Sequence, residues 1–423
     1  MELIVLLLGL LGLLAIRVPV AFALLISSMF VFAILGLNPL VAVQRLSAGI
    51  DVFTLMAIPF FVFAGDLMTQ TGIAARLIKV AEGMFGRVRG GLGHVNVGAS
   101  MMFGAVSGSA IASVSAIGST MIPIMEEKGY DRDFSVNVTS SAAVLGLIIP
   151  PSHNMIIYSA AAAVSISIGD LFVAGILPGL LCGLALMATV SVIARRKGYP
   201  KGIFPGFRAL AKSALIALPG LMTAIIIVVG ILGGVFTPTE SSAVAIVYTL
   251  VIGVFVYRSL GLKEFKAAVV NSTKTTAMIM LIIGSAAAFG WLLALLEAPT
   301  MMSDLILGAT DSPILILLMV LGCLLLLGTF MDMAPLIIIV TPIFLPVVQT
   351  IGIDPVHFGI IMMLALGIGT ITPPVGTVLF VGAAVGKIRV EDTVKTMWPF
   401  YMALIICLLV ITYVPAISLL LVG

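Results

Sequence analysis

The feature that most constrains the fold of this chain is an apolar run broken by two adjacent prolines, which occurs twice. The first copy, Ala142–Ala161, reads AAVLGLIIPPSHNMIIYSAA, and the second, Ala365–Ala384, reads ALGIGTITPPVGTVLFVGAA. Two consecutive prolines remove two amide donors and clash with carbonyls one turn earlier, so each helix must break. At membrane depth, the freed backbone groups are tolerated only where they are buried in protein or line a cavity. Each run therefore predicts a broken helix beside a polar cavity.

The composition identifies the surroundings of these breaks as a membrane. The chain is 61% hydrophobic and 9% charged, whereas soluble domains are about 25% charged. Many of its apolar runs approach the roughly 20 residues that a spanning helix needs. The net charge of +3 is small and scattered, which predicts no nucleic-acid partner. Cys182, Cys323 and Cys407 lie singly in apolar runs and are interpreted as core residues. The sequence predicts an all-α polytopic membrane protein.

The N-terminal apolar run is interpreted as a retained first span. Glu2 stands where a signal peptide would carry a basic region. Residues 73–89 mix basic and apolar residues on one helix, which is typical of a helix lying on a membrane surface. Further along, Thr239 is expected to cap the helix that begins near Ser241.

Two longer apolar runs have polar centres. Val95–Met125 contains Ser107-Gly108-Ser109, and Ile314–Gln349 contains the interruption from Gly328 to Pro335. A run of this length with a small polar centre predicts a re-entrant helical hairpin, which enters and leaves by one side. A single long tilted helix is the alternative for the first run.

The two halves of the chain repeat each other at a constant offset of 223 residues. The alignment of the two halves needs no gap between Pro123 and Ala161. At this offset the first proline pair coincides with the second, and Gly146 coincides with Gly369. Ser109 then falls opposite Asp332. Each half is expected to comprise scaffold helices followed by a hairpin and a broken helix. The expected divisions are a scaffold region 1–90, a transport region 91–194, a basic cytoplasmic linker 195–212, a second scaffold region 213–312 and a second transport region 313–423.

The basic residues predict an orientation. Suppose that the N-terminus is outside and that each hairpin returns to its own side. The cytoplasmic segments then contain 20 of the 21 basic residues, from Arg17 to Lys395, and only Arg45 lies outside. This is a strong positive-inside pattern. The same tracing starts the first half outside and the second half inside. The sequence therefore predicts two inverted-topology repeats with both termini in the periplasm.

Inverted repeats with broken helices place the binding site of a transporter near the bilayer midplane. Unwound carbonyls and hydroxyl or carboxylate oxygens are hard ligands suited to Na⁺, and half-helix N-termini suit a carboxylate. One cation site is predicted in each half, so two or more Na⁺ ions are expected. The predicted cation ligands are Ser107, Ser109 and Gly146 in the first half, and Gly328, Thr329, Asp332, Gly369 and Thr372 in the second. The predicted substrate contacts are Ser107, Pro150, Asn154 and Thr377. The alternative for each serine and glycine is that it only permits close helix packing, whereas an ionisable group in an apolar run, such as Asp332, is functional by default.

Five motifs resemble one family. GAVSGSAIASVSAIGSTMIP (104–123), GLIIPPS (146–152), GGVFTPTESSA (233–243), GTFMDMAPLIIIVTPIFLP (328–346) and GIGTITPPVG (367–376) resemble the large membrane subunit of tripartite ATP-independent periplasmic (TRAP) transporters. The resemblance implies a Na⁺-driven importer in a bacterial inner membrane that works as an elevator. It also implies a periplasmic substrate-binding protein, a small four-helix membrane subunit on a separate polypeptide, and organic-acid solutes such as C4-dicarboxylates and sialic acids.

The sequence also permits other functions. A Na⁺- or H⁺-coupled organic-anion symporter without a binding protein is the main alternative. A passive channel would not need paired hairpins and breaks, and an ATP-driven permease would need a nucleotide-binding partner, because the chain has no G-x-x-x-x-G-K-[ST] loop. An intramembrane serine protease would use Ser107 with His153 as base, but Ala105 stands where the nucleophile turn needs glycine. No enzymatic activity is expected, and the sequence does not identify the solute.

Overall fold

The computed structural model describes residues 1–16, 18–162, 164–202, 206–310 and 312–422, with the backbone alone at residues 303, 307 and 309. Arg17 and linker residues 203–205 lie outside the described residues. The described chain is almost entirely helical, and its only strand-like pairing is a bridge between Arg89 and Lys201. Seven of the described helices are long and apolar enough to cross a membrane. An eighth span results if 132–148 and 153–161, which meet at 50°, are counted together. The prediction of an all-α polytopic membrane protein is confirmed.

The first half of the chain runs from α1 to α11. Its helices are α1 (Glu2–Ala15), α2 (Val20–Ile34), α3 (Pro39–Ile50), a 3₁₀ turn η1 (Phe53–Met56), α4 (Ala57–Gln70), α5 (Ile73–Phe85), α6 (Gly91–Ser107), α7 (Ala110–Glu127), α8 (Arg132–Ala143), α9 (Leu145–Ile148), α10 (His153–Ala161) and α11 (Ile168–Lys197).

The second half runs from α12 to α21 and follows the same order. Its helices are α12 (Phe207–Leu232), α13 (Pro238–Val251), a π-helical turn η2 (Ile252–Val256), α14 (Leu262–Leu295), α15 (Ala298–Ala309), α16 (Pro313–Gly328), α17 (Met333–Thr350), α18 (Pro355–Thr370), α19 (Thr377–Gly386), α20 (Val390–Tyr413) and α21 (Ala416–Leu419). Both ends of α7 and α17, and the starts of α8 and α18, are separated by 223 residues, the offset found in the sequence.

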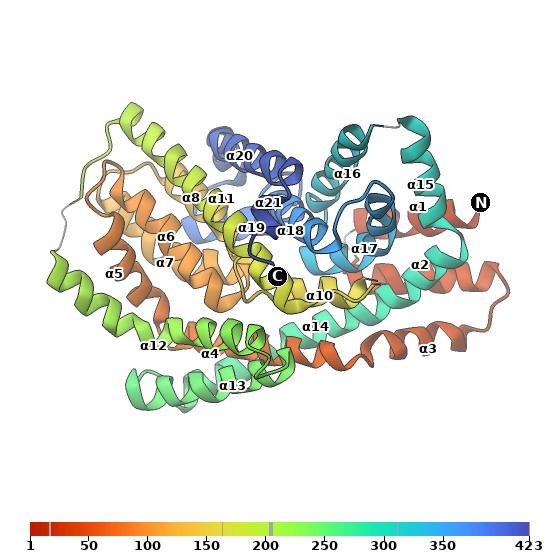
Figure 1. Cartoon of the computed structure of the whole chain (residues 1–423), viewed down its shortest axis with the longest axis horizontal. Helices are drawn as coiled ribbons and strands as arrows, with labels where there is room; N and C mark the ends of the chain where they lie inside the picture. Colours follow the sequence, from red (N-terminus) through yellow and green to blue (C-terminus); the bar gives the residue numbers. More distant parts are fainter. Residues whose placement is uncertain (17, 163, 203–205, 311, 423) are drawn as a thin grey trace.

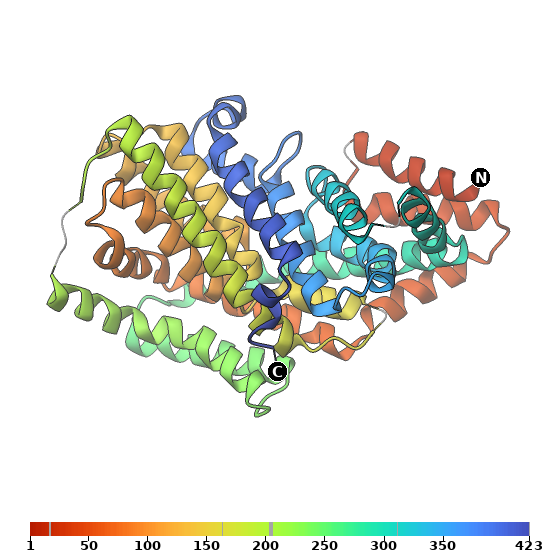
Figure 2. The same ribbon diagram turned by 45° about the horizontal axis from the view of Figure 1, so that its top comes forward.

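The helices pack into two groups that draw on both halves. In the first group, α14 contacts α2, α3 and α4, and α13 contacts α4 and α12. In the second, the contacts are reciprocal: α10 packs on α17 as α19 packs on α7, and α11 packs on α18 as α20 packs on α8. Figure 1 shows α12, α13, α4, α14 and α3 along the lower edge, with much of the second group above them. Figure 2 shows α11 and α20 crossing the middle of the second group.

Helix α5 joins the two groups. Its apolar residues, among them Ile73, Leu77 and Ala81, are buried, and the helix packs against α6 and α12. The amphipathic pattern predicted at 73–89 is therefore present, but its apolar face covers protein rather than lipid.

The polar centres of the two long apolar runs are turns between packed helices. Helices α6 and α7 contact each other on either side of Gly108, whose φ of +62° is in the left-handed region. The chain reverses there, because glycine adopts this conformation without the steric cost that a Cβ brings. The alternative of one long continuous helix is wrong. Helices α16 and α17 likewise contact each other across residues 329–332.

The proline pairs break their helices at the expected places. Helices α8 and α9 run as far as Ile148, and α10 begins after Pro150-Pro151. In the second copy α18 ends at Thr370, and α19 begins at Thr377 after Pro373-Pro374. Tyr158 of α10 donates a hydrogen bond to the Pro355 carbonyl at 2.6 Å, which ties the first broken helix to the start of the second.

Three local predictions differ from the structure. Helix α3 was not expected, although Asn38 caps it and Pro39 occupies its first turn. The apolar run Ala277–Leu296 predicts a span, but the helix that contains most of it, α14, already begins at Leu262, because Lys263, Lys266 and Lys274 are good helix formers that do not end a helix. The cap predicted at Thr239 is wrong. Thr237 is the N-cap and forms a capping box with Glu240, while Pro238 takes the first helical position, which suits its fixed φ.

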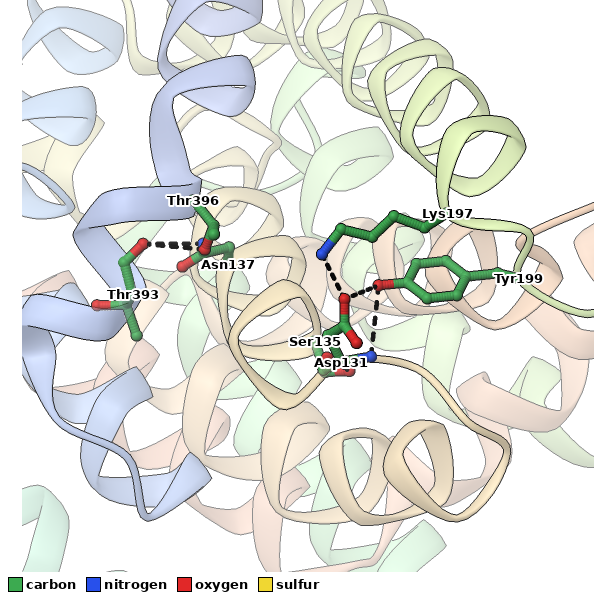
Figure 3. A network of polar contacts seen from close by, with 7 residues as sticks. All are labelled: Asp131, Ser135, Asn137, Lys197, Tyr199, Thr393 and Thr396. Atoms are coloured by element: carbon green, nitrogen blue, oxygen red, sulfur yellow. Dashed lines mark hydrogen bonds and ion pairs between the residues drawn. The ribbon is translucent and has the colours of Figure 1, made fainter.

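Polar contacts near one end of α8 join distant parts of the chain (Figure 3). Asn137 Nδ2 donates to the Thr393 carbonyl at 3.0 Å and to Thr396 Oγ1 at 2.7 Å, which links α8 to α20. Asp131, just before α8, accepts hydrogen bonds from Tyr199 at 2.9 Å and from Lys197. The end of α11 is thereby fastened to the start of α8.

Candidate substrate and cation site

A cavity of about 500 Å³ lies where the two groups of helices meet. The first group contributes α4 and α14, and the second contributes the α6–α7 turn, α10 and the start of α17. Polar side chains face it from every one of these elements. They are Asp66, Thr69, Ser107, Ser109, Ser115, His153, Asn154, Asn271, Thr275, Asp332 and Thr370.

The α6–α7 turn forms one wall of this cavity. Ser109 is the N-cap of α7, and its hydroxyl accepts a hydrogen bond from the Ala112 amide at 3.3 Å. The turn lies against the first proline break, since a Cβ on Gly108 would be 3.0 Å from the Pro151 carbonyl oxygen. It also lies against α4, since a Cβ on Gly65 would be 3.2 Å from the Ser107 carbonyl oxygen. The turn thus fills the space between the break and α4.

The α16–α17 turn places Asp332 at the equivalent position. Asp332 is the N-cap residue of α17, but its side chain makes no capping hydrogen bond. Its Oδ1 accepts a 3.4 Å hydrogen bond from Thr377 Oγ1, at the start of α19. The Thr329 carbonyl in the same turn accepts hydrogen bonds from the Val375 and Gly376 amides at 3.1 and 3.2 Å. These bonds hold the turn against the second proline break.

Glycines let the turns approach the broken helices closely. A Cβ on Gly146 would be 2.9 Å from Gly104 Cα, and a Cβ on Gly369 would be 2.5 Å from Gly328 Cα. Because carbon atoms normally pack at about 3.5–4.0 Å, no larger residue fits at these contacts without moving a helix. Close packing is therefore one demonstrable role of these glycines.

The predicted site residues fall into two sets. Ser107, Ser109, Asn154 and Asp332 line the cavity together. Gly146, Pro150, Gly328, Thr329, Gly369, Thr372 and Thr377 do not line it. Pro150 is buried, and its predicted contact with a solute stays a prediction. Thr372 donates its hydroxyl to the Ile368 carbonyl at 2.7 Å. Thr377 donates its hydroxyl to Asp332, which lines the cavity.

Sequence reasoning missed six polar residues of this cavity, which are Asp66, Thr69, Ser115, Asn271, Thr275 and Thr370. Asp66 comes from α4, and its Oδ2 is buried without a hydrogen-bond partner. A usable signal was present, because Asp66 is the only charged residue in the apolar run Phe53–Met68, and such a group marks a functional site. Asn271 and Thr275 lie one turn apart on α14, and their role follows only from the packing.

The cavity has an unusual charge balance for a site that would take an anion. Asp66 and Asp332 both line it, and no lysine or arginine does so in the part of the chain that the structure describes. An organic anion entering this space meets two carboxyl groups without a fixed cation. An unpaired charge at low dielectric is costly, so the lack of a lysine or arginine among the described lining residues bears on any function assigned to this cavity.

These features define the class of protein: a multi-pass helical membrane protein with a polar cavity between two groups of helices, as in a secondary transporter. The chain matches the family described as "Tripartite ATP-independent periplasmic transporter, DctM component" over residues 7–417. It belongs to this family, the large permease subunits of TRAP transporters.

Two relatives illustrate the range of this family. The C4-dicarboxylate TRAP transporter large permease DctM of Pseudomonas aeruginosa is 43% identical over 87% of this chain and 86% of its own. The sialic acid TRAP transporter large permease SiaM of Vibrio cholerae is 39% identical over 98% and 96%. The YdaH transporter of Alcanivorax borkumensis, at 13% identity, has a related fold, with a TM-score of 0.59 over 89% of this chain and 87% of its own. A transporter family argues against the serine protease alternative.

Proposed function

We propose that this chain is the large permease subunit of a Na⁺-coupled importer that takes up an organic acid from a periplasmic binding protein. Its relatives are TRAP permeases for sialic acid and for C4-dicarboxylates, both of which are organic acids. The observation that carries the proposal is the cavity with two carboxyl groups and no basic residue among the described lining residues. Cations that travel with the solute would supply the missing positive charge.

Asp332 is the proposed centre of a Na⁺ site in the second half. Its carboxylate is free of any capping bond, and the Thr329, Gly328, Gly369 and Thr372 backbone or hydroxyl oxygens belong to the two segments that meet beside it. In the first half the proposed ligands are Ser107, Ser109 and the backbone at Gly146, so at least two ions would be bound. Asn154, buried and facing the cavity, is proposed to contact the solute.

An elevator mechanism is proposed from the division of the helices. The α4 and α14 walls of the cavity belong to one packed group, and the turns and broken helices belong to the other. Sliding of the second group would carry Ser107, Asn154 and Asp332 away from Asp66 and Asn271. The same proposal places the chain in a bacterial inner membrane with both termini in the periplasm and a separate small membrane subunit beside it.

Reconstituted uptake tests the proposal. Proteoliposomes containing this chain and a small subunit would be loaded without Na⁺ and given labelled sialic acid or C4-dicarboxylate with a binding protein. Uptake should require both an inward Na⁺ gradient and the binding protein. Uptake driven by a pH gradient in the absence of Na⁺ would instead support H⁺ coupling, and uptake without the binding protein would support the simpler symporter.

A further inference from the structure

A second cavity, of about 420 Å³, lies at the corner where α4 ends and α5 begins. Its other walls are formed by α12 and by the turn that follows η2. It shares no lining residue with the cavity described above. Its polar lining comes from Gln70, Thr71, Arg76, Lys79, Ser213 and Ser259. The two cations, the Ser213 hydroxyl and the Gln70 amide are hydrogen-bond donors, whereas the Thr71 and Ser259 hydroxyls donate to the Met68 and Thr71 carbonyls.

Arg76 is held in place at this cavity. Its Nη1 donates to the Thr71 carbonyl at 2.7 Å, and its guanidinium lies over the Tyr257 ring, 3.8 Å from the centroid. The Tyr257 hydroxyl in turn accepts from the Gly220 amide and donates to the Ile216 carbonyl, each at 3.0 Å. An arginine fixed in this way keeps further N–H groups for a ligand, because a guanidinium has five donors.

The other charged residue that lines this cavity, and two that directly precede lining residues in the sequence, are also basic. Lys79, one turn after Arg76, is exposed, and in the described part of the chain it forms no ion pair. Lys212 and Arg258 directly precede the lining residues Ser213 and Ser259. No acidic side chain lines the cavity among the residues that the structure describes. This is the electrostatic character of a phosphate-binding pocket.

The cavity lies where two helices change from basic to apolar. On α12 the change comes between Lys212 and Leu215. In the segment that runs from η2 into the following turn, it comes between Val256 and Arg258. Leu215 and Phe255, on the apolar sides, are 69% and 70% exposed. In a membrane-spanning chain these side chains contact acyl chains, so the donors of the cavity lie at the level of the lipid headgroups.

We propose that this cavity binds the phosphate-bearing headgroup of an anionic phospholipid, with the acyl chains lying along Leu215 and Phe255. Arg76 and Lys79 contact the phosphate, and the Ser213 hydroxyl donates a hydrogen bond to one of its oxygens. A zwitterionic headgroup fits less well, because its ammonium group would find no acid in the cavity. Basic pockets between helices at a membrane boundary are known to suit such headgroups.

The test uses the detergent-purified chain and two conservative variants that leave Arg76 and its packing intact, Lys79→Gln and Lys212→Gln. Lys128→Gln is the matched control, since Lys128 is an exposed lysine in the α7–α8 turn, remote in sequence from every lining residue. Thermal stability would be measured during titration with phosphatidylglycerol, phosphatidylcholine or inorganic phosphate. The lipid that co-purifies with each variant would be identified by mass spectrometry.

Phosphatidylglycerol should stabilise the wild type and Lys128→Gln, and it should co-purify with both. Its apparent affinity should fall about five-fold when either Lys79 or Lys212 is replaced, the effect expected for one cation at a membrane surface. Equal stabilisation by phosphatidylcholine, or by inorganic phosphate alone, would overturn the lipid assignment. So would unchanged phosphatidylglycerol binding in the Lys79→Gln, Lys212→Gln double variant.

Discussion

The close contact between Gly369 and Gly328 leads to a quantitative prediction. A Cβ at position 369 would lie 2.5 Å from both the Cα and the carbonyl carbon of Gly328. Since packed carbon atoms prefer about 3.5–4.0 Å, the Gly369→Ala variant must move α16 away from α18 by about 1 Å at this point. Neither contacting atom belongs to a flexible side chain, so the strain cannot be relieved by a rotamer change. Overpacking of this kind costs about 1–3 kcal/mol, a factor of about 5 to 150 in the folding equilibrium.

A second glycine provides the control for this prediction. Gly322 lies in the same helix α16, and a Cβ there would have no neighbour within 4 Å. Gly322→Ala should therefore gain only the helix propensity of alanine, about 0.5–1 kcal/mol. Comparing the two variants removes that propensity term and leaves the cost of the contact.

The assay is thermal unfolding of each purified variant in detergent, followed by Na⁺-driven uptake in proteoliposomes. Gly369→Ala should melt below the wild type, and Gly322→Ala should melt at or above it. Uptake should also fall in Gly369→Ala, because the contact positions the turn that contains Asp332. If Gly369→Ala melts with Gly322→Ala and transports normally, α16 and α18 do not need this approach, and the packing argument is refuted.

Four further predictions concern acidic residues and the membrane topology. Asp332→Ala should abolish Na⁺-coupled uptake while the protein remains inserted, and unchanged uptake would remove Asp332 from the site. Asp66→Asn keeps the side-chain volume and should raise the Na⁺ concentration needed for half-maximal uptake. A cysteine at exposed Ser165 should react with an impermeant maleimide from the periplasm and one at exposed Arg196 from the cytoplasm; the opposite pattern would overturn the proposed topology. The hydrogen bond from Lys197 lowers the pKa of Asp131, so this pair should stabilise the fold above the ordinary aspartate pKa of about 3.9 and lose its contribution as pH falls below it. Since the two side chains are 42% and 49% exposed, Asp131→Asn should cost less than about 1 kcal/mol at pH 7, measured as a shift in denaturant midpoint that disappears in acid.

The parts of the fold that depend on local chemistry were predictable from the sequence. Pro150-Pro151 and Pro373-Pro374 end their helices because no proline can supply an amide donor, and Gly108 and Gly328 mark the turns between packed helices. The N-cap of α13 was misplaced at Thr239 because both Thr237 and Thr239 are good caps. The spacing from Thr237 to Glu240, rather than the residue type, decides between them.

The composition of the cavity was only partly predictable. Ser107, Ser109, Asn154 and Asp332 lie in the turns and at the break, so the repeat pointed to them directly. Asn271 and Thr275 face the cavity because α14 packs against α17 of the second group of helices. No sequence periodicity encodes this tertiary contact. Asp66 was partly predictable. The sequence shows an isolated acid in an apolar run, but it does not show which helices this acid faces across the cavity.

The two halves of the site differ in a way that the sequence repeat conceals. Ser109 and Asp332 occupy equivalent positions, each at the start of the second helix after a turn. The Ser109 hydroxyl is used by its own helix, where it accepts the Ala112 amide, whereas the Asp332 carboxylate caps nothing. The glycines at both breaks are explained by backbone contact with Gly104 and Gly328. In the proposed function, charge compensation in the cavity would therefore rest on two carboxyl groups from different helix groups, Asp332 and Asp66. The proposed elevator movement, which separates α4 from the α16–α17 turn, would separate these two charges. It would thereby couple the position of the second helix group to the number of cations that we propose the cavity to bind.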